Sequence, residues 1–267
     1  MGDAPKDGRP VAFRGGGFAT RPVGVVGPVV LVAVIAVWEV GCRTGFIHPL
    51  VLPAPSEAFN AFMELARSGL LWKHIGASLQ RLVVGWICGT ALGLSVGFMI
   101  GLFSLARAGL APLVAAIFPI PKIALLPLFI IWFGIGEGSK VATILFGTFF
   151  PTVVATYGGV DNVDRSLIRM GQSFGLNWFS IVRKIILPGA LPAILPGFRI
   201  SAAIAIVLLV AAEMIGAEFG VGAYILLAGS LMATDQLIAG VAMLSVLGVA
   251  INWTIGRTEK YLLRWRA

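Results

Sequence analysis

The chain has 267 residues, of which 58% are hydrophobic and 12% are charged, and its mean hydropathy is +0.95. A soluble domain carries about 25% charged residues, so this composition excludes an ordinary water-soluble domain and indicates that lipid is the main solvent. The formal net charge of +8 comes with no nucleic-acid-binding motif, and nucleic acid is not expected as a partner.

Six apolar runs are long enough to cross a membrane, because a spanning helix needs about 20 residues. They lack the alternation of barrel strands, so we predict an all-α polytopic membrane protein with six transmembrane helices. The expected spans are Val23–Cys42, Leu79–Phe103, Leu110–Phe133, Val141–Val160, Ala193–Gly216 and Leu237–Gly256.

The positions of Lys and Arg predict the orientation of these spans. Most of the basic residues outside the spans lie in the two tails and in the link between the fourth and fifth spans. Cytoplasmic loops carry an excess of Lys and Arg, so both termini and this link are expected in the cytoplasm. The expected parts are a flexible tail (1–22), the first span with an outer interfacial helix (23–78), a core (79–257) that contains the cytoplasmic loop 161–190, and a basic tail (258–267).

A short amphipathic pattern follows the first span. Three prolines precede Ser56, which is a candidate N-cap, and Gly69 can close the helix. This helix is too short to span, so we expect it to lie along the outer surface of the membrane that the spans cross, or to pack against other helices. Its apolar residues, at i, i+3, i+4 and i+7, are Phe59, Phe62, Met63 and Ala66.

The second span carries a glycine at every fourth position. Such a stripe exposes the backbone along one side of a helix and allows another helix to approach closely. We therefore predict dense helix packing at these positions, which are Gly85, Gly89, Gly93, Gly97 and Gly101.

The third span contains Pro119, Pro121 and Pro127, each of which removes a backbone donor and disturbs the preceding turn. Broken helices at membrane depth occur where they line a cavity or are buried in protein. Lys122 lies in this broken stretch and suggests a translocation pathway. The alternative is that Lys122 lies near the cytoplasmic end and extends to the membrane surface.

Glu213 in the fifth span is flanked by apolar residues, so it needs a cationic partner, protonation or water. Lys122 is one candidate partner, and a structural or gating role is favoured over direct contact with substrate. The link after this span holds a short apolar stretch that fits a re-entrant or interfacial segment.

Catalytic and cofactor motifs are missing from the sequence. The segment GIGEGSK at 134–140 has the glycines and lysine of a phosphate loop in the wrong order and spacing. The two histidines, His48 and His74, have no cluster of Cys or Asp around them. The chain is therefore not expected to be an enzyme, to hold a metal or to hydrolyse ATP itself.

The link between the fourth and fifth spans predicts two short helices at an angle. Asp164 suits the start of the first helix, and Gly175 can adopt the left-handed conformation at its end. Asn177 can cap the second helix, WFSIVRKIIL, which Pro188 is expected to stop. A basic and aromatic hairpin of this kind fits a socket on another protein or a lipid headgroup.

Gly175, nine intervening residues and then Ile185, Ile186, Leu187 and Pro188 resemble the G-x9-I-x-L-P core of the loop in ABC-importer permeases. The family's preceding Glu-Ala-Ala is replaced here by Arg169-Met170-Gly171. From Leu52 to Arg266, segments such as LPAPSE, SLQRLVVGW, IPKIALLPLFIIWFGIGEGSK, FFPTVVATYGGVDNVD, AAEMI and LLRWR resemble the nitrate/sulfonate/taurine branch of these permeases.

The resemblance implies a type I importer in a bacterial inner membrane, in which the loop is the coupling helix. The implied partners are a second permease copy, two cytoplasmic ATPase subunits that bind ATP and magnesium, and a periplasmic or lipid-anchored substrate-binding protein. The solute is expected to be a small anion of the sulfonate, nitrate or aromatic or other organic acid type. The expected coupling residues are Arg169, Met170, Gly171, Phe174, Gly175, Leu176, Asn177, Ile185, Leu187 and Pro188, and the expected pathway residues are Pro121, Lys122, Pro127 and Glu213.

Two other functions are compatible with a polytopic chain. A secondary transporter or channel, not coupled to ATP, would show internal repeats or a selectivity ring, and no convincing repeat is found. An integral-membrane enzyme would need a metal or nucleophile constellation.

Overall fold

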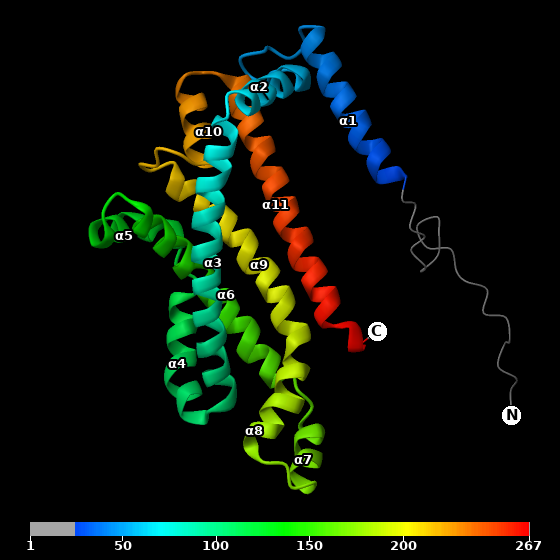
Figure 1. Ribbon diagram of the computed structural model, residues 1–267, viewed down its shortest axis with the longest axis vertical. Helices are drawn as coiled ribbons and strands as arrows, with labels where there is room; N and C mark the ends of the chain where they lie inside the picture. Colours follow the sequence, from blue (N-terminus) through cyan, green and yellow to red (C-terminus); the bar gives the residue numbers. More distant parts are fainter. Residues whose placement is uncertain (1–24, 267) are drawn as a thin grey trace, which may run out of the picture. The chain divides into compact units, whose positions relative to one another are not determined.

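The computed structural model describes residues 25–266, and all the regular secondary structure in this range is helical (Figure 1). The chain divides between Ser56 and Glu57 into two compact units. The expected boundary between residues 78 and 79 instead falls inside a helix, and the expected tail 1–22 lies outside the described residues.

The first unit contains α1 (Val26–Arg43) and the start of α2 (Pro55–Arg67). Glu39 of α1 organises the unit, because its carboxylate accepts hydrogen bonds from Arg43 Nε at 2.6 Å and from Ser56 Oγ at 2.8 Å. The backbone N–H of Ser56 also donates to Glu39, at 3.1 Å. Because α2 begins at Pro55, Ser56 lies inside the first turn of this helix, and the prediction that it is the N-cap was wrong.

Most of the chain's membrane-spanning capacity lies in the second unit. Five described helices are long and apolar enough to cross a membrane, α1 among them, and a bent pair forms a sixth span if it is counted as one. The other helices are α3 (Leu70–Leu102), α4 (Ser104–Ile117), α5 (Leu126–Phe133), α6 (Glu137–Asp161), α7 (Arg165–Ser173), α8 (Trp178–Ile181), α9 (Leu187–Glu213), α10 (Val221–Ser230) and α11 (Thr234–Leu262).

The helix α3 begins earlier than the expected second span. Gly69 has a φ of 75°, which a residue with a side chain rarely adopts, and it separates α2 from α3. The helix therefore includes His74 and Ser78, which the sequence placed in an outer link. At the other end of the chain α11 extends to Leu262, so the expected tail 258–267 begins inside this helix.

The glycine stripe of α3 packs against α6. A Cβ atom built on Gly89 would lie 2.0 Å from Thr148 Oγ1, and one on Gly97 would lie 2.5 Å from the Cβ of Thr156. The hydroxyl of Thr148 donates to the Ile144 carbonyl of its own helix at 2.9 Å, which leaves no unpaired donor in the contact. The residues of α6 that meet the five glycines in turn are Ile144, Thr148, Thr152, Thr156 and Val160.

The expected third span is a bent pair. A 3-10 turn (Lys122–Leu125) separates α4 from α5, and the two helical parts are bent by 91°. Pro119 and Pro121 lie in the break, where they cannot donate backbone hydrogen bonds. Pro127 does not interrupt a helix, because it lies in the first turn of α5, where no intrahelical donor is needed.

Helix α8 continues into α9 instead of stopping at Pro188. A π-helical turn (Val182–Ile186) joins them, and the backbone N–H of Leu187 donates to the Val182 carbonyl five residues earlier. The wider turn accommodates a proline that lacks an N–H, and Pro188 lies in the first turn of α9. The expected stop at Pro188 was therefore wrong, and Trp178–Glu213 forms one helix of 36 residues.

Helix α6 is packed on two sides, against α3 and α9. On the α9 side, a Cβ atom on Gly197 would lie 2.3 Å from the Cβ of Ala155. In Figure 1, α7 and α8 lie at one end of the second unit, and α10 lies at the other. The short α10 lies between α9 and α11 in the chain, where a re-entrant or interfacial segment was predicted.

Candidate functional site

The α7–α8 hairpin (residues 161–190) is shaped by two caps and one turn. The Asp164 carboxylate accepts a hydrogen bond from the Ser166 N–H at 2.8 Å and caps α7. Gly175 has a φ of 71°, which turns the chain out of α7. The side chain of Asn177 then accepts a hydrogen bond from the Ser180 N–H at 2.8 Å and caps α8.

The Asp164 cap also has an electrostatic effect. The backbone N–H of Ser166 holds the pKa of the Asp164 carboxyl below its ordinary value. The carboxylate is therefore stabilised at the positive end of the α7 dipole.

The absence of a side chain at Gly171 allows the two arms of the hairpin to touch. A Cβ atom there would lie 2.8 Å from Ile185 Cδ1 and 3.4 Å from Leu176 Cδ1. Gly171 is buried although it lies on a short exposed helix. The hairpin is therefore a packed unit with a fixed angle between its arms.

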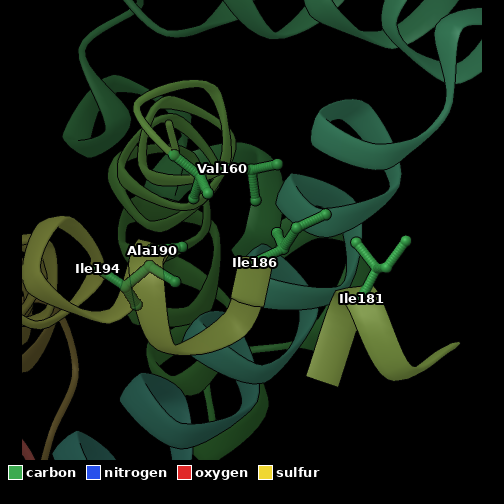
Figure 2. Close-up of a cluster of buried hydrophobic side chains, with 6 residues drawn as sticks. Val160, Ile181, Ile186, Ala190 and Ile194 are labelled. Atoms are coloured by element: carbon green, nitrogen blue, oxygen red, sulfur yellow. The ribbon is translucent and has the colours of Figure 1, made fainter. Parts of the chain in front are cut away.

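An apolar cluster joins the base of the hairpin to the long helices (Figure 2). Val160 at the end of α6, Ile181 of α8 and Ile194 of α9 are each at least 92% buried. Ile186 in the π-helical turn and Ala190 complete the contact between these elements. A displacement of the hairpin would therefore be transmitted to α6 and α9, because close-packed side chains deform little.

The outer surface of the hairpin is aromatic and basic. Phe174 is 78% exposed, Phe179 64% and Trp178 56%. The exposed basic residues on the same hairpin are Arg165, Arg169, Arg183 and Lys184. Large exposed aromatic side chains flanked by charges are typical of contact surfaces.

The ten expected coupling residues divide into two groups. Those exposed at the surface of the hairpin are Arg169, Met170, Phe174 and Leu187. Those that shape or pack the hairpin are Gly171, Gly175, Leu176, Asn177, Ile185 and Pro188. Sequence reasoning left Trp178 and Phe179 out of this set, although both follow the Asn177 cap directly and fall on its first turn.

Glu213 is paired with Arg81, and not with Lys122. Its side chain is 0% exposed, and its carboxylate accepts hydrogen bonds from Arg81 Nη1 at 2.8 Å and from Ser78 Oγ at 2.7 and 2.9 Å. The N–H of Gly222 also donates to it, at 2.9 Å. The side chains of α3 that hold this region share one face of the helix, since His74, Ser78 and Arg81 are spaced at i, i+4 and i+7.

Lys122 has a separate set of partners at the break between α4 and α5. Its Nζ donates to the carbonyl oxygens of Ile117, Phe118 and Ile120 at 3.0, 2.8 and 2.7 Å. The ammonium also lies 4.8 Å from the ring centroid of Phe150. Lys122 therefore caps the carbonyl end of α4, where a cation is favourable, and the expected approach to Glu213 is not found.

Sequence reasoning missed the partners of Glu213, which are Ser78 and Arg81 of α3. Arg81 falls inside the expected second span, Leu79–Phe103, and Ser78 falls just before it, but neither residue was singled out. Polar residues repeating at helical spacing in an apolar context were the available signal. This signal could be used only if the start of the helix at Leu70 was known, because the spacing places these polar residues on one face of a single helix.

The fold and the hairpin together define a class, that of multi-pass helical permeases with a short helical hairpin between two long helices. The family model described as binding-protein-dependent transport system inner membrane component matches residues 89–262. The chain belongs to this family, and it is a membrane subunit of an ABC importer.

Relatives cover most of the chain. It is 36% identical over 233 residues to SsuC of Bacillus subtilis (strain 168), which is named as an aliphatic sulfonates transport permease protein. The match covers 87% of this chain and 84% of SsuC. It is 34% identical to the taurine transport system permease protein TauC of Escherichia coli (strain K12), with 88% of this chain and 87% of TauC covered. The riboflavin transport system permease protein RibX of Chloroflexus aurantiacus is 31% identical, with 90% of each chain covered.

A solved structure shares the fold. The inward facing MetNI methionine ABC transporter matches with a TM-score of 0.63 and 22% sequence identity, over 74% of this chain and 98% of that chain. The helices of this chain therefore have the arrangement of a type I importer permease.

Proposed function

We propose that two copies of this chain form the pathway of an ATP-driven importer for a small anionic solute of the sulfonate type. Two cytoplasmic ATPase subunits, which bind ATP and magnesium, would supply the energy, and a periplasmic or lipid-anchored binding protein would deliver the solute. In this arrangement the hairpin and both termini face the cytoplasm of a bacterium.

The observation that carries this proposal is the construction of the hairpin. Its exposed face presents Phe174, Trp178 and Phe179, while its base is fixed to α6 and α9 by the apolar cluster. A rigid element with an exposed aromatic face can transmit a movement of a partner into the membrane. We assign Arg169, Met170, Phe174 and Leu187 to contact with the ATPase, and the packed residues of the hairpin to its shape.

The sulfonate class is supported by the relatives named for taurine and aliphatic sulfonates. The relative named for riboflavin shows that similar chains are named for other solutes. Stimulation of ATP hydrolysis by taurine, ethanesulfonate and riboflavin, each with its loaded binding protein, would separate these classes.

The proposed coupling is tested in the reconstituted complex with Phe174→Ser. Loss of a central aromatic contact weakens an interface by about tenfold or more, so the variant should bind less ATPase and lose solute-stimulated hydrolysis. Phe46→Ser is the matched control, because Phe46 is 91% exposed and lies in the first unit. Equal ATPase binding by the two variants would contradict the role of the hairpin.

A secondary transporter or channel is the competing function. Solute uptake into liposomes that contain this chain alone, driven by an ion gradient or by the solute gradient, would favour it. Uptake that requires ATP and the ATPase subunit would favour the importer.

A further inference from the structure

A cavity of about 420 Å³ lies at the end of the second unit that carries α10. It is bounded by the loop between α5 and α6 and by the elbow between α9 and α10, defined as residues 214–220. Its size falls within the range of about 300–1,000 Å³ that small-molecule sites occupy. The polar side chains that line it are Gln80, Arg81, Glu137, Lys140 and Glu218.

One edge of the Arg81 guanidinium is held by buried contacts. Nη1 donates to Glu213 Oε1 at 2.8 Å and to the carbonyl oxygen of Phe219 at 2.6 Å. The Arg81 side chain is only 6% exposed, and Glu213 is 0% exposed. Breaking a buried ion pair leaves an uncompensated charge away from water, so this edge keeps its partners.

The opposite edge of the same guanidinium faces an exposed carboxylate. Nε and Nη2 donate to the two Glu137 oxygens at 2.5 and 2.7 Å, which is a side-on bidentate pair. Glu137 is 64% exposed, and water screens such pairs strongly. Arg81 therefore pairs with two carboxylates, and the pair with the exposed Glu137 is more easily broken than the pair with the buried Glu213.

Glu137 lies at the start of a helix, where its side chain can move. It is the first residue of α6 and follows Gly134, whose φ is 79°, and Gly136. Because the Glu137 side chain is 64% exposed at the start of α6, rotation about its own side-chain bonds would remove the carboxylate from Arg81 without disturbing the contact of α6 with α3.

Lys140 adds a second cation to the cavity. Its side chain is buried, with 3% exposure for the residue, and its Nζ donates to the Gly136 carbonyl at 3.0 Å. Among the described residues this is its single hydrogen bond, and none of their carboxylates lies within ion-pair distance of it. A lysine ammonium carries three donors, so two remain for a ligand.

We propose that the Nε–Nη2 edge of Arg81 and the ammonium of Lys140 form a binding site for the sulfonate or carboxylate group of a small anion. In this structure the Glu137 carboxylate takes the position of that group, and it leaves when the solute enters. A guanidinium edge matches two coplanar oxygens of either group. The proposal rests on the proposed function, because it supplies the anionic class of the solute with a site on the permease.

The test measures binding of radiolabelled ethanesulfonate to the permease–ATPase complex in nanodiscs, without the binding protein. Glu137→Gln removes the competing carboxylate and should tighten binding by about fivefold, the effect of losing an exposed ion pair. Glu218→Gln is the matched control, because Glu218 lines the same cavity but forms no ion pair among the described residues. It should change binding by less than about twofold, since it removes charge without freeing Arg81.

Lys140→Gln should weaken binding, and the neutral probe ethyl methyl sulfone should not bind. Equal effects of Glu137→Gln and Glu218→Gln, or equal binding of the sulfone, would overturn the site. ATP-driven import is measured separately on the wild-type complex with its binding protein. Import without any ethanesulfonate binding overturns the site alone, whereas binding without ATP dependence of uptake overturns the proposed function alone.

Discussion

The two ends of the helix Trp178–Glu213 are built in opposite ways. At the first end, Phe174, Trp178 and Phe179 are more than half exposed, and apolar residues hold the hairpin from beneath. At the other end, Glu213 is 0% exposed and each of its oxygens accepts a hydrogen bond from this chain. The first end is suited to contact with another molecule, and the second holds the chain to itself.

This difference has an energetic basis. Exposed aromatic surface contributes to stability only when a partner covers it, because its removal from water lowers the free energy. A buried carboxylate has already lost its water and depends on its internal partners. The same rigid helix thus carries an unsatisfied surface at one end and a satisfied charge at the other. Changes at the two ends should therefore have different consequences for assembly and for folding.

The largest effect is expected from Glu213→Ala. The change removes the buried carboxylate that faces the Arg81 guanidinium, and it should reduce the free energy of unfolding by about 3–5 kcal/mol. Glu259→Ala removes the pair with Arg199, whose side chain is 47% exposed, and should cost about 0–1 kcal/mol. Thermal melting of the purified variants compares the two, and equal melting temperatures would contradict the assigned role of the buried pair.

Gly93→Ala tests the seam between α3 and α6. The new Cβ atom would lie 2.7 Å from the Cβ of Thr152 and 2.8 Å from the carbonyl oxygen of Phe149. Overpacking of this kind costs about 1–3 kcal/mol. Gly76→Ala in the same helix meets no atom within 4 Å and should stabilise by about 0.5–1 kcal/mol. The sign of the two melting shifts is the measurement, and an unchanged or raised melting temperature for Gly93→Ala would show that the seam tolerates a side chain.

Gly175→Val tests the shape of the hairpin. A β-branched residue in the left-handed conformation costs about 1–3 kcal/mol, so the angle between α7 and α8 should change while the long helices still insert. Gly175→Asn is the control, because asparagine tolerates this conformation better than valine. Solute-stimulated ATP hydrolysis should drop for the valine variant and recover for the asparagine variant. Normal stimulation with valine would remove the argument for a fixed hairpin.

Lys122→Met should have a smaller effect on stability, about 0.3–1 kcal/mol, which is typical of a cation at the carbonyl end of a helix. Methionine retains an apolar stem beside Phe150 and removes the charge. If Lys122 also raises the local concentration of anions in the pathway, transport should slow more than basal ATP hydrolysis. A normal transport rate over a range of salt concentrations would restrict Lys122 to its structural role.

The smallest effect is expected from the pH dependence of the α7 cap. The pKa of Asp164 is lowered in the folded state, so its contribution to stability is present above the ordinary aspartate pKa of about 3.9 and is lost as the pH falls through the lower, folded value. The rate of hydrogen exchange at the Ser166 amide, measured over a range of pH and corrected for the intrinsic pH dependence of exchange, should show this loss. Asp164→Asn keeps an accepting side chain without the titration, and it should show no such step.

Local signals predicted the hairpin, because its determinants act over a few residues. Asp164, Gly175 and Asn177 each satisfy a backbone requirement within one turn, and all three do so in the structure. Pro188 misled for a related reason. A proline removes a donor wherever it occurs, but a preceding π-helical turn let the helix continue, and Ile186 of this turn packs in the cluster that contains Val160 of α6.

Long-range partners were the part that could not be predicted. The glycine repeat in α3 indicated a close contact, but nothing local identifies α6 as the helix that approaches. The partner of Glu213 depends on where Arg81 lies in the fold, 132 positions away in the chain. Lys122 was a reasonable candidate by charge, yet its ammonium is occupied by carbonyl groups of its own broken span.

The two sides of the seam, the glycines of α3 and the threonines of α6, are synthesised at different times. Gly101 leaves the ribosome about 60 residues before Val160, which corresponds to about 3–12 s at typical elongation rates. During that interval α6 is not yet complete, and it cannot cover the grooved face of α3. The membrane must therefore accommodate an incomplete helix pair in every round of translation, and codons that slow synthesis between α3 and α6 would prolong that state.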